Sequence, residues 1–158
     1  TVEIYWPDEL DADIDLWVLG PGDRPVGYSN RGGVVFNLLR DDLGNLADTT
    51  PFNYEVAYSR GLPAGEYVVN IHLYRFPMQG NFAGMSNKTP IEVQVVVGIK
   101  ESPAATWRRL AGKSVTLSSF GQEITVMRFT IDETGMLVRG SINDVPKALR
   151  SAAPGAVQ

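Results

Sequence analysis

Apolar and polar residues alternate with a period of two along most of the chain, while the 3.6-residue period of a helix is nearly absent. In the segment DIDLWVLG, for example, Ile14, Leu16 and Val18 share one face of an extended chain. Segments of this kind recur between turns rich in Gly, Pro, Asn and Asp, which is typical of β-strands. Ten segments have this character, and about nine strands are expected from them: 1–6, 13–20, 26–30, 34–40, 52–59, 65–76, 91–100, 113–119, 121–132 and 135–142.

Many short strands separated by turn residues predict an all-β fold, an antiparallel β-sandwich of jelly-roll-like type. Helix is expected in at most one or two short segments. The segment 143–152 has Asn143 or Asp144 as a cap and Pro146 in its first turn, and the segment 102–112 is the second candidate.

The length of 158 residues fits one domain. We expect residues 1–150 to form a single sandwich and the small-residue tail 151–158 to be weakly ordered. A hydrophobic content of 44% and a charged content of 20% are those of a globular protein.

Charge and cysteine content exclude several function classes. The net charge is −4 and lysines and arginines are dispersed along the chain, so nucleic acid is not an expected partner. The absence of cysteine excludes disulfides, thiolate metal sites and cysteine nucleophiles. No window approaches the roughly 20 apolar residues of a membrane helix, and no signal peptide is visible. Because the chain starts at Thr1, we expect that an N-terminal signal or membrane anchor has been removed.

The segment DELDADIDLW, residues 8–17, has five acidic side chains within eight positions. Asp11, Asp13 and Asp15 are spaced two apart, so in an extended chain they project to the same side. A second acidic pair, Asp41 and Asp42, ends the strand 34–40. If the two acidic segments are adjacent, their carboxylates converge and need a cation, an arginine or raised pKa values to coexist.

These aspartates are therefore candidate metal ligands. Hard cations such as Ca²⁺ take about six to eight oxygen ligands, which carboxylates can supply. The segment is not an EF-hand loop, because the required glycine and the distal glutamate are missing. A network centred on Arg40 and a simple solvated acidic edge both stay open as alternatives to Ca²⁺. The candidate metal ligands are Asp11, Asp13, Asp15, Asp41 and Asp42.

The sequence contains few motifs that are typical of enzyme active sites. Glycoside hydrolysis needs two carboxyl groups across a cleft, one with a raised pKa, and clustered aspartates at the start of a strand fit cation ligands better. His72 is the only histidine, and no G-x-S-x-G or H-E-x-x-H pattern is present. We expect His72 to be a packed or hydrogen-bonded residue, and the chain not to be an enzyme.

Two regions are candidates for partner binding. The strand-free segment 77–90 contains Met78, Phe82 and Met85 among glycines and asparagines, which suits a contact surface; alternatively, these residues fold back over one end of the sandwich. Trp17 shares a face with Asp13 and Asp15 and is the candidate for stacking on a glycan, although aromatic residues on strands also fit a two-layer core.

Two segments carry a family resemblance. DIDLWVLGPGDRPVGYSN (13–30) and PAGEYVVNIHLY (63–74) together resemble bacterial pre-peptidase C-terminal domains and related extracytoplasmic β-sandwich families. In these families a D-x-D strand and a Pro/Gly turn precede a later strand with a G-x-Y pattern. The resemblance covers about residues 11–75, and Asp13 and Asp15 match the D-x-D directly. Asp11, Asp41 and Asp42 are outside this pattern.

The resemblance implies a non-catalytic, often calcium-associated sandwich that is periplasmic or extracellular and attached to a larger assembly. The first 18 residues are also similar to the start of small bacterial and phage-encoded envelope proteins in which the sandwich follows a membrane anchor. We therefore expect a binding or structural module with a protein or glycan partner. The alternatives are a glycan hydrolase or carbohydrate-binding domain that uses the aspartates and Trp17, and a subunit of a virion or filament. The oligomeric state stays open.

Overall fold

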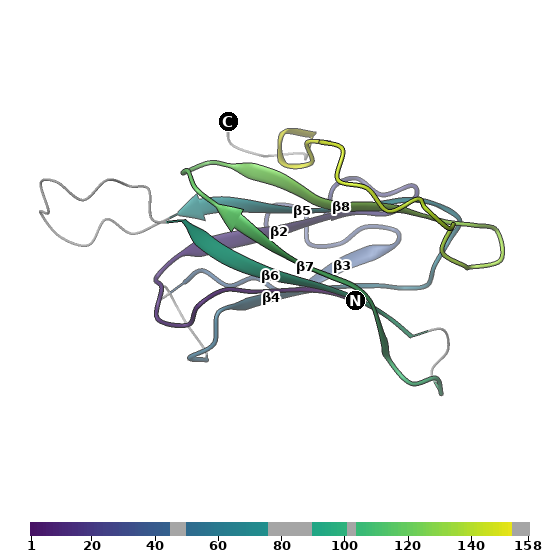
Figure 1. Cartoon of the computed structure of the whole chain (residues 1–158), viewed down its shortest axis with the longest axis horizontal. Coiled ribbons are helices and arrows are strands. Elements are labelled where there is room, and N and C mark those ends of the chain that lie inside the picture. The colour runs from purple at the N-terminus through teal and green to yellow at the C-terminus, as the bar shows by residue number, and fades with distance from the viewer. Residues whose placement is uncertain (45–49, 76–89, 101–103, 153–158) are drawn as a thin grey trace, which may run out of the picture.

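The computed structural model describes residues 1–44, 50–75, 90–100 and 104–152. Two antiparallel sheets lie face to face as two layers (Figure 1), which confirms the expected β-sandwich. One sheet has five strands in the order β3-β4-β1-β6-β7, and the other has three in the order β2-β5-β8. The strands are β1 (Val2–Tyr5), β2 (Asp13–Leu19), β3 (Phe36–Arg40), β4 (Tyr54–Ser59), β5 (Gly65–Arg75), β6 (Ile91–Ile99), β7 (Arg108–Leu117) and β8 (Glu123–Ile131).

The described residues contain eight strands, because two of the expected strands are reduced to isolated bridges. In the segment 26–30, Val26 pairs with Val18, but Gly27 and Asn30 then bond to each other and close a tight loop. In the segment 135–142, Gly135 and Gly140 have φ values of 80° and 76°, a left-handed conformation that turns the chain at both ends of a short stretch.

Neither helix expectation is confirmed. The described part of the segment 102–112 runs from residue 104, and Arg108 already begins β7, which pairs with β6 along its length. In the segment 143–152, Asn143 exchanges two backbone hydrogen bonds with Arg128 of β8, and residues 144–149 form no regular element. It ends in a single 3₁₀ turn, η1 (Arg150–Ala152), and residues 153–158 of the expected tail lie outside the described residues. No described helix is long and apolar enough to cross a membrane.

The main core lies between the two sheets, and the alternation predicted for β2 is confirmed there. Ile14, Leu16 and Val18 are fully buried in this core, together with Val2 and Ile4 of β1. These residues form the apolar inner faces of the two sheets, and the packing of one sheet on the other shields both faces from water.

The opposite face of β2 is also buried, contrary to its polar pattern. Trp17 is fully buried in a second small cluster with Val68 and Leu149. Leu149 belongs to the C-terminal segment, which crosses the outer face of the three-stranded sheet (Figure 1). As a result, the acidic side chains of β2 lie in a covered environment.

β2 is an edge strand of the three-stranded sheet, so its outward backbone amides need partners from elsewhere. The amide of Val18 donates to the carbonyl oxygen of Val26 at 2.9 Å. The amide of Leu16 donates to a side-chain oxygen of Glu55 on β4, in the other sheet, at 2.7 Å. The two sheets are linked at this edge of β2, and the acidic side chains near Asp15 lie there.

Candidate metal centre

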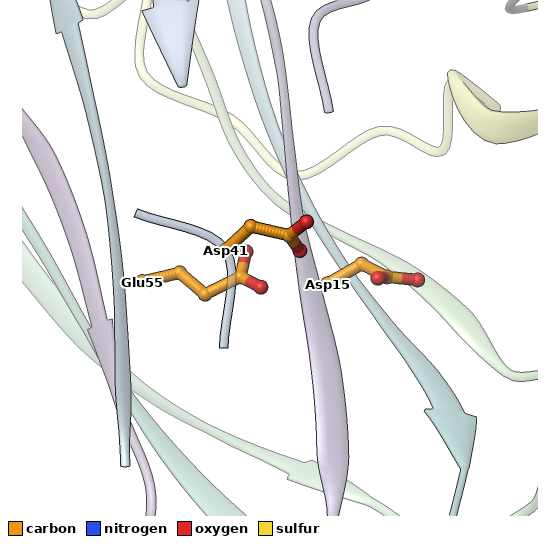
Figure 2. A group of neighbouring side chains, drawn as sticks. All are labelled: Asp15, Asp41 and Glu55. Carbon is orange, nitrogen blue, oxygen red and sulfur yellow. The ribbon is translucent and has the colours of Figure 1, made fainter. Parts of the chain in front are cut away.

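Three carboxylates from three separate segments gather at the edge of β2 (Figure 2). Asp15 lies on β2, Asp41 follows the end of β3, and Glu55 lies on β4. One oxygen of each side chain is within 4.8 Å of the others. Asp15 and Asp41 are among the candidates from the sequence, and their predicted adjacency is found; Glu55 is not among those candidates.

Glu55 is held by backbone donors from two directions. Its Oε2 accepts the amide of Leu16 at 2.7 Å, and its Oε1 accepts the amide of Asp42 at 3.1 Å. Burial raises the pKa of Glu55 well above its ordinary value, and the nearby charge of Asp15 and then that of Asp41 add to the rise. The two oxygens of Glu55 therefore accept the backbone amides of Leu16 and Asp42. The ionised form of Glu55 is nevertheless disfavoured unless a positive charge lies nearby.

Asp15 is paired with the only histidine of the chain. His72 lies opposite Asp15 on β5, and its Nδ1 is 2.8 Å from Asp15 Oδ2, with both side chains buried. Burial raises the pKa of Asp15, while His72 opposes this shift and the charge of Asp41 adds to it. The expectation that His72 is a packed, hydrogen-bonded residue is confirmed.

Asp41 is the member of the group nearest to solvent. Its side chain is 14% exposed, and its Oδ2 lies 3.8 Å from the guanidinium of Arg31, which is itself half exposed. Its buried Oδ1 has no hydrogen-bond partner in the part of the chain that the structure describes. Asp41 thus brings an unsatisfied oxygen to the group from the side that solvent reaches.

Asp13 lies two residues before Asp15 on the same face of β2. It is buried, and its Oδ1 has no hydrogen-bond partner among the described residues. The pKa of Asp13 is raised to about 7, mainly by burial and then by the charges of Asp15, Asp41 and Asp42, while Arg75 opposes the rise. Asp13 therefore interacts electrostatically with Asp15 and Asp41, although its own oxygens are not among the three carboxylate oxygens that converge.

The other two candidate ligands are engaged with arginines. Asp42 Oδ2 accepts a bond from Arg40 at 2.8 Å, and its Oδ1 accepts the amide of Gly44 at 3.1 Å. Asp11 lies 3.4 Å from Arg75. Asp42 thus pairs with Arg40, as the alternative of an Arg40-centred network expects, whereas Asp11 pairs with Arg75; neither is among the three converging carboxylates.

The structure corrects the expectation for Trp17. Its side chain is fully buried beside Val68 and Leu149, so it has no surface with which to stack on a glycan or another partner. The other candidate partner-binding residues, Met78, Phe82 and Met85, lie outside the described residues.

The three converging side chains all offer oxygen donors, which suit a hard cation better than a soft one. The Asp15, Asp41 and Glu55 group could hold a metal ion. Comparison with known proteins adds no further assignment, because no family model, no curated protein and no solved structure matches this chain. The fold and the geometry of the site are therefore the basis for any functional conclusion.

Proposed function

We propose that this chain is a non-catalytic binding or structural module in which a divalent cation, Ca²⁺, links the two sheets at the edge of β2. The observation that carries this proposal is the convergence of Asp15 on β2, Glu55 on β4 of the other sheet, and Asp41 in the loop from β3 to β4. A cation bound there supplies the positive charge that these buried carboxylates lack and stabilises the folded chain.

The donor set fits such an ion. The buried Oδ1 atoms of Asp13 and Asp41 have no partner among the described residues, and a buried carboxylate oxygen without a partner is costly. Asp15, Asp41 and Glu55 are the direct ligands in this proposal, and Asp13 contributes negative charge nearby. Ca²⁺ is favoured over Mg²⁺ because it accepts irregular oxygen geometry, whereas Mg²⁺ requires a near-ideal octahedron and retains its water.

A location of this chain outside the cytoplasm is consistent with Ca²⁺ as the bound ion. The D-x-D formed by Asp13 and Asp15 matches the pattern of the exported sandwich families that the sequence resembles. Extracellular modules bind Ca²⁺ with dissociation constants of about 10⁻⁴ to 10⁻³ M, which suits a site with three carboxylates. Under this proposal the ion keeps the edge of β2 rigid while another surface of the sandwich contacts a protein or glycan.

Glycan hydrolysis has less support at this site. A hydrolase needs its two carboxyl groups on opposite sides of an open substrate cleft. Asp15 and Glu55 are each less than 5% exposed, and both are engaged in hydrogen bonds with the protein itself. Two open grooves of about 590 and 690 Å³ in the part of the chain that the structure describes are lined by other residues.

Thermal unfolding in Ca²⁺ and in excess chelator tests the proposal. At a free Ca²⁺ concentration of about 100 times the dissociation constant, binding adds about 2.7 kcal/mol to the free energy of unfolding. For a chain of this size that raises the melting temperature by about 5–10 °C. Mg²⁺ at the same concentration is expected to have a smaller effect. A melting temperature that is the same in Ca²⁺ and in chelator would sink the proposal.

A further inference from the structure

A second surface with the features of a binding site lies on the outer side of the five-stranded sheet. It is an open groove of about 690 Å³, a volume within the range of ligand sites. Its walls come from β1 with the turn that follows it and from the start of β4 with the residues before it. We call it the aromatic groove, and its principal lining residues are Tyr5, Pro7, Asp8, Glu9, Phe52 and Tyr54.

Aromatic residues line the aromatic groove, among them Tyr5 from β1 and Phe52 and Tyr54 from the start of β4 and the residues before it. Tyr5 and Tyr54 are directly opposite each other on adjacent strands, and their rings stack with centroids 6.1 Å apart. Phe52 is 59% exposed and Tyr5 is 39% exposed. Large aromatic side chains are usually buried, so an exposed cluster of them at a groove marks a contact surface.

The charge of the aromatic groove is negative. Asp8 and Glu9 are both exposed, and the described residues that line the groove include no lysine or arginine. The electron-rich faces of aromatic rings attract cations, and carboxylates at the rim add to this attraction. The chain makes the same kind of contact itself, because the guanidinium of Arg40 lies 4.3 Å from the centre of the Tyr54 ring.

The groove is held in shape by a buried asparagine. Asn53 donates its side-chain amide to the carbonyl oxygens of Pro7 and Leu10, each at 2.8 Å. Its backbone amide donates to Asp8 Oδ1 at 2.9 Å. These bonds tie the turn after β1 to the residues before β4, so the two walls are positioned before any ligand arrives.

We infer that the aromatic groove binds arginine or lysine side chains of an extended peptide segment from a protein partner. The flat rings accept the cationic head groups, and Asp8 and Glu9 pair with their charge. The groove is on the outer face of the sheet, whereas Glu55 of the carboxylate group points into the sandwich from β4. The inference shares with the proposed function only the idea of a protein partner, and it does not require a bound Ca²⁺.

Titration of the full chain with matched peptides tests this inference. The probes are the N-acetylated, C-amidated peptide Gly-Arg-Gly-Arg-Gly-Arg, the same peptide with glutamine or glutamate in place of arginine, and the neutral oligosaccharide cellohexaose. Backbone amide shifts in NMR spectra report where each probe binds. We expect the arginine peptide to shift the amides of Tyr5, Phe52 and Tyr54, to bind more weakly at high salt, and to bind more tightly than the other probes.

Two variants remove the proposed contacts without touching the core. Phe52→Ala is expected to weaken binding of the arginine peptide about two- to fivefold, the effect of an exposed cation–π contact. Glu9→Gln is expected to weaken it by a similar factor and to reduce the dependence on salt. The matched controls are Phe120→Ala, at a phenylalanine 67% exposed elsewhere, and Glu133→Gln, at another exposed glutamate, and both should bind as the native chain does.

Three results would overturn the inference. The first is equal binding of the arginine and glutamine peptides, and the second is binding of cellohexaose in the groove in place of the arginine peptide. The third is that no probe shifts the amides of the groove. The melting temperature of each sample in Ca²⁺ and in chelator is recorded separately, so failure of this inference is distinct from failure of the proposed function.

Discussion

The carboxylate of Glu55 on β4 accepts the backbone amide of Leu16 on β2 at 2.7 Å, which links the five-stranded sheet to the edge strand of the three-stranded sheet. The same carboxylate accepts the amide of Asp42 with its second oxygen. An amide at the edge of a sheet is commonly left to water, but here it is buried and needs a protein acceptor. One acidic side chain therefore satisfies two buried donors and brings its charge next to Asp15 and Asp41.

Replacement of Glu55 by alanine is expected to destabilise the chain strongly. Each buried amide that loses its acceptor costs about 1–3 kcal/mol, so the loss of both in Glu55→Ala should lower the free energy of unfolding by about 2–6 kcal/mol. Urea denaturation measures this change. The exposed Glu133 provides the control, and Glu133→Ala should change the stability by less than about 0.5 kcal/mol. Equal stabilities for the two variants would contradict the role given to Glu55.

Asp41 and Asp42 are neighbours in sequence but have different partners, so their variants should separate the metal site from the arginine network. Asp41→Asn is expected to remove the rise in melting temperature caused by Ca²⁺, because it removes a converging carboxylate. Asp42→Asn is expected to retain that rise but to lower the stability by about 2 kcal/mol or more, because it removes the buried negative charge that pairs with Arg40 at 2.8 Å. Thermal melts of both variants in Ca²⁺ and in chelator make the comparison. Loss of the Ca²⁺ response in both variants would mean that Asp42 also holds the ion.

β2 shows which features of a strand the alternation of apolar and polar residues predicts and which features it does not predict. The burial of Ile14, Leu16 and Val18 follows from their shared face and is confirmed. Alternation does not say whether the other face is covered. Trp17 is buried because Leu149, more than 100 residues later, packs over it, and no local pattern carries that information.

Glu55 was missed because its strand has apolar residues on both faces. In the segment 52–59 the bulky residues Tyr54 and Val56 occupy one face, and Glu55 shares the other with Ala57. The register of β4 against β1 decides which face is buried, since Ile4 lies opposite Glu55 and directly opposite residues share a face. By contrast, Asp41 could be named as a candidate neighbour of Asp15, because it is one of two aspartates that directly follow the end of β3.

The pH dependence of stability in the absence of divalent cations should reveal the raised pKa of Asp13. Its pKa in the folded chain is about 7, above its ordinary value of 3.8, so the folded state holds a proton that the unfolded state releases between these values. The stability that this proton provides is fully present below pH 3.8 and is lost as the pH rises toward 7. Asp15 and Glu55 also have raised pKa values and act in the same direction.

The variant Asp13→Asn isolates this contribution. Its stability relative to the native chain should increase with pH over the same interval, by up to about 1.4 kcal/mol per pH unit. Urea denaturation of both proteins in chelator, at several pH values across the interval, measures the difference. Parallel profiles for the native chain and the variant would show that Asp13 does not titrate in this range. Saturating Ca²⁺ should reduce the loss of stability at neutral pH, because its charge compensates the ionised carboxylates.

The C-terminal segment should be an integral part of the fold, because Leu149 covers Trp17 on the outer face of the three-stranded sheet. Leu149 is 1% exposed, and Leu149→Ala is expected to lower the free energy of unfolding by about 2–5 kcal/mol. Val145 lies on the same segment but is 57% exposed, so Val145→Ala should change the stability by less than about 0.5 kcal/mol. Urea denaturation followed by near-ultraviolet circular dichroism measures both variants. If the Leu149 variant is as stable as the Val145 variant, the segment rests on the sheet without stabilising it, and the burial of Trp17 has another cause.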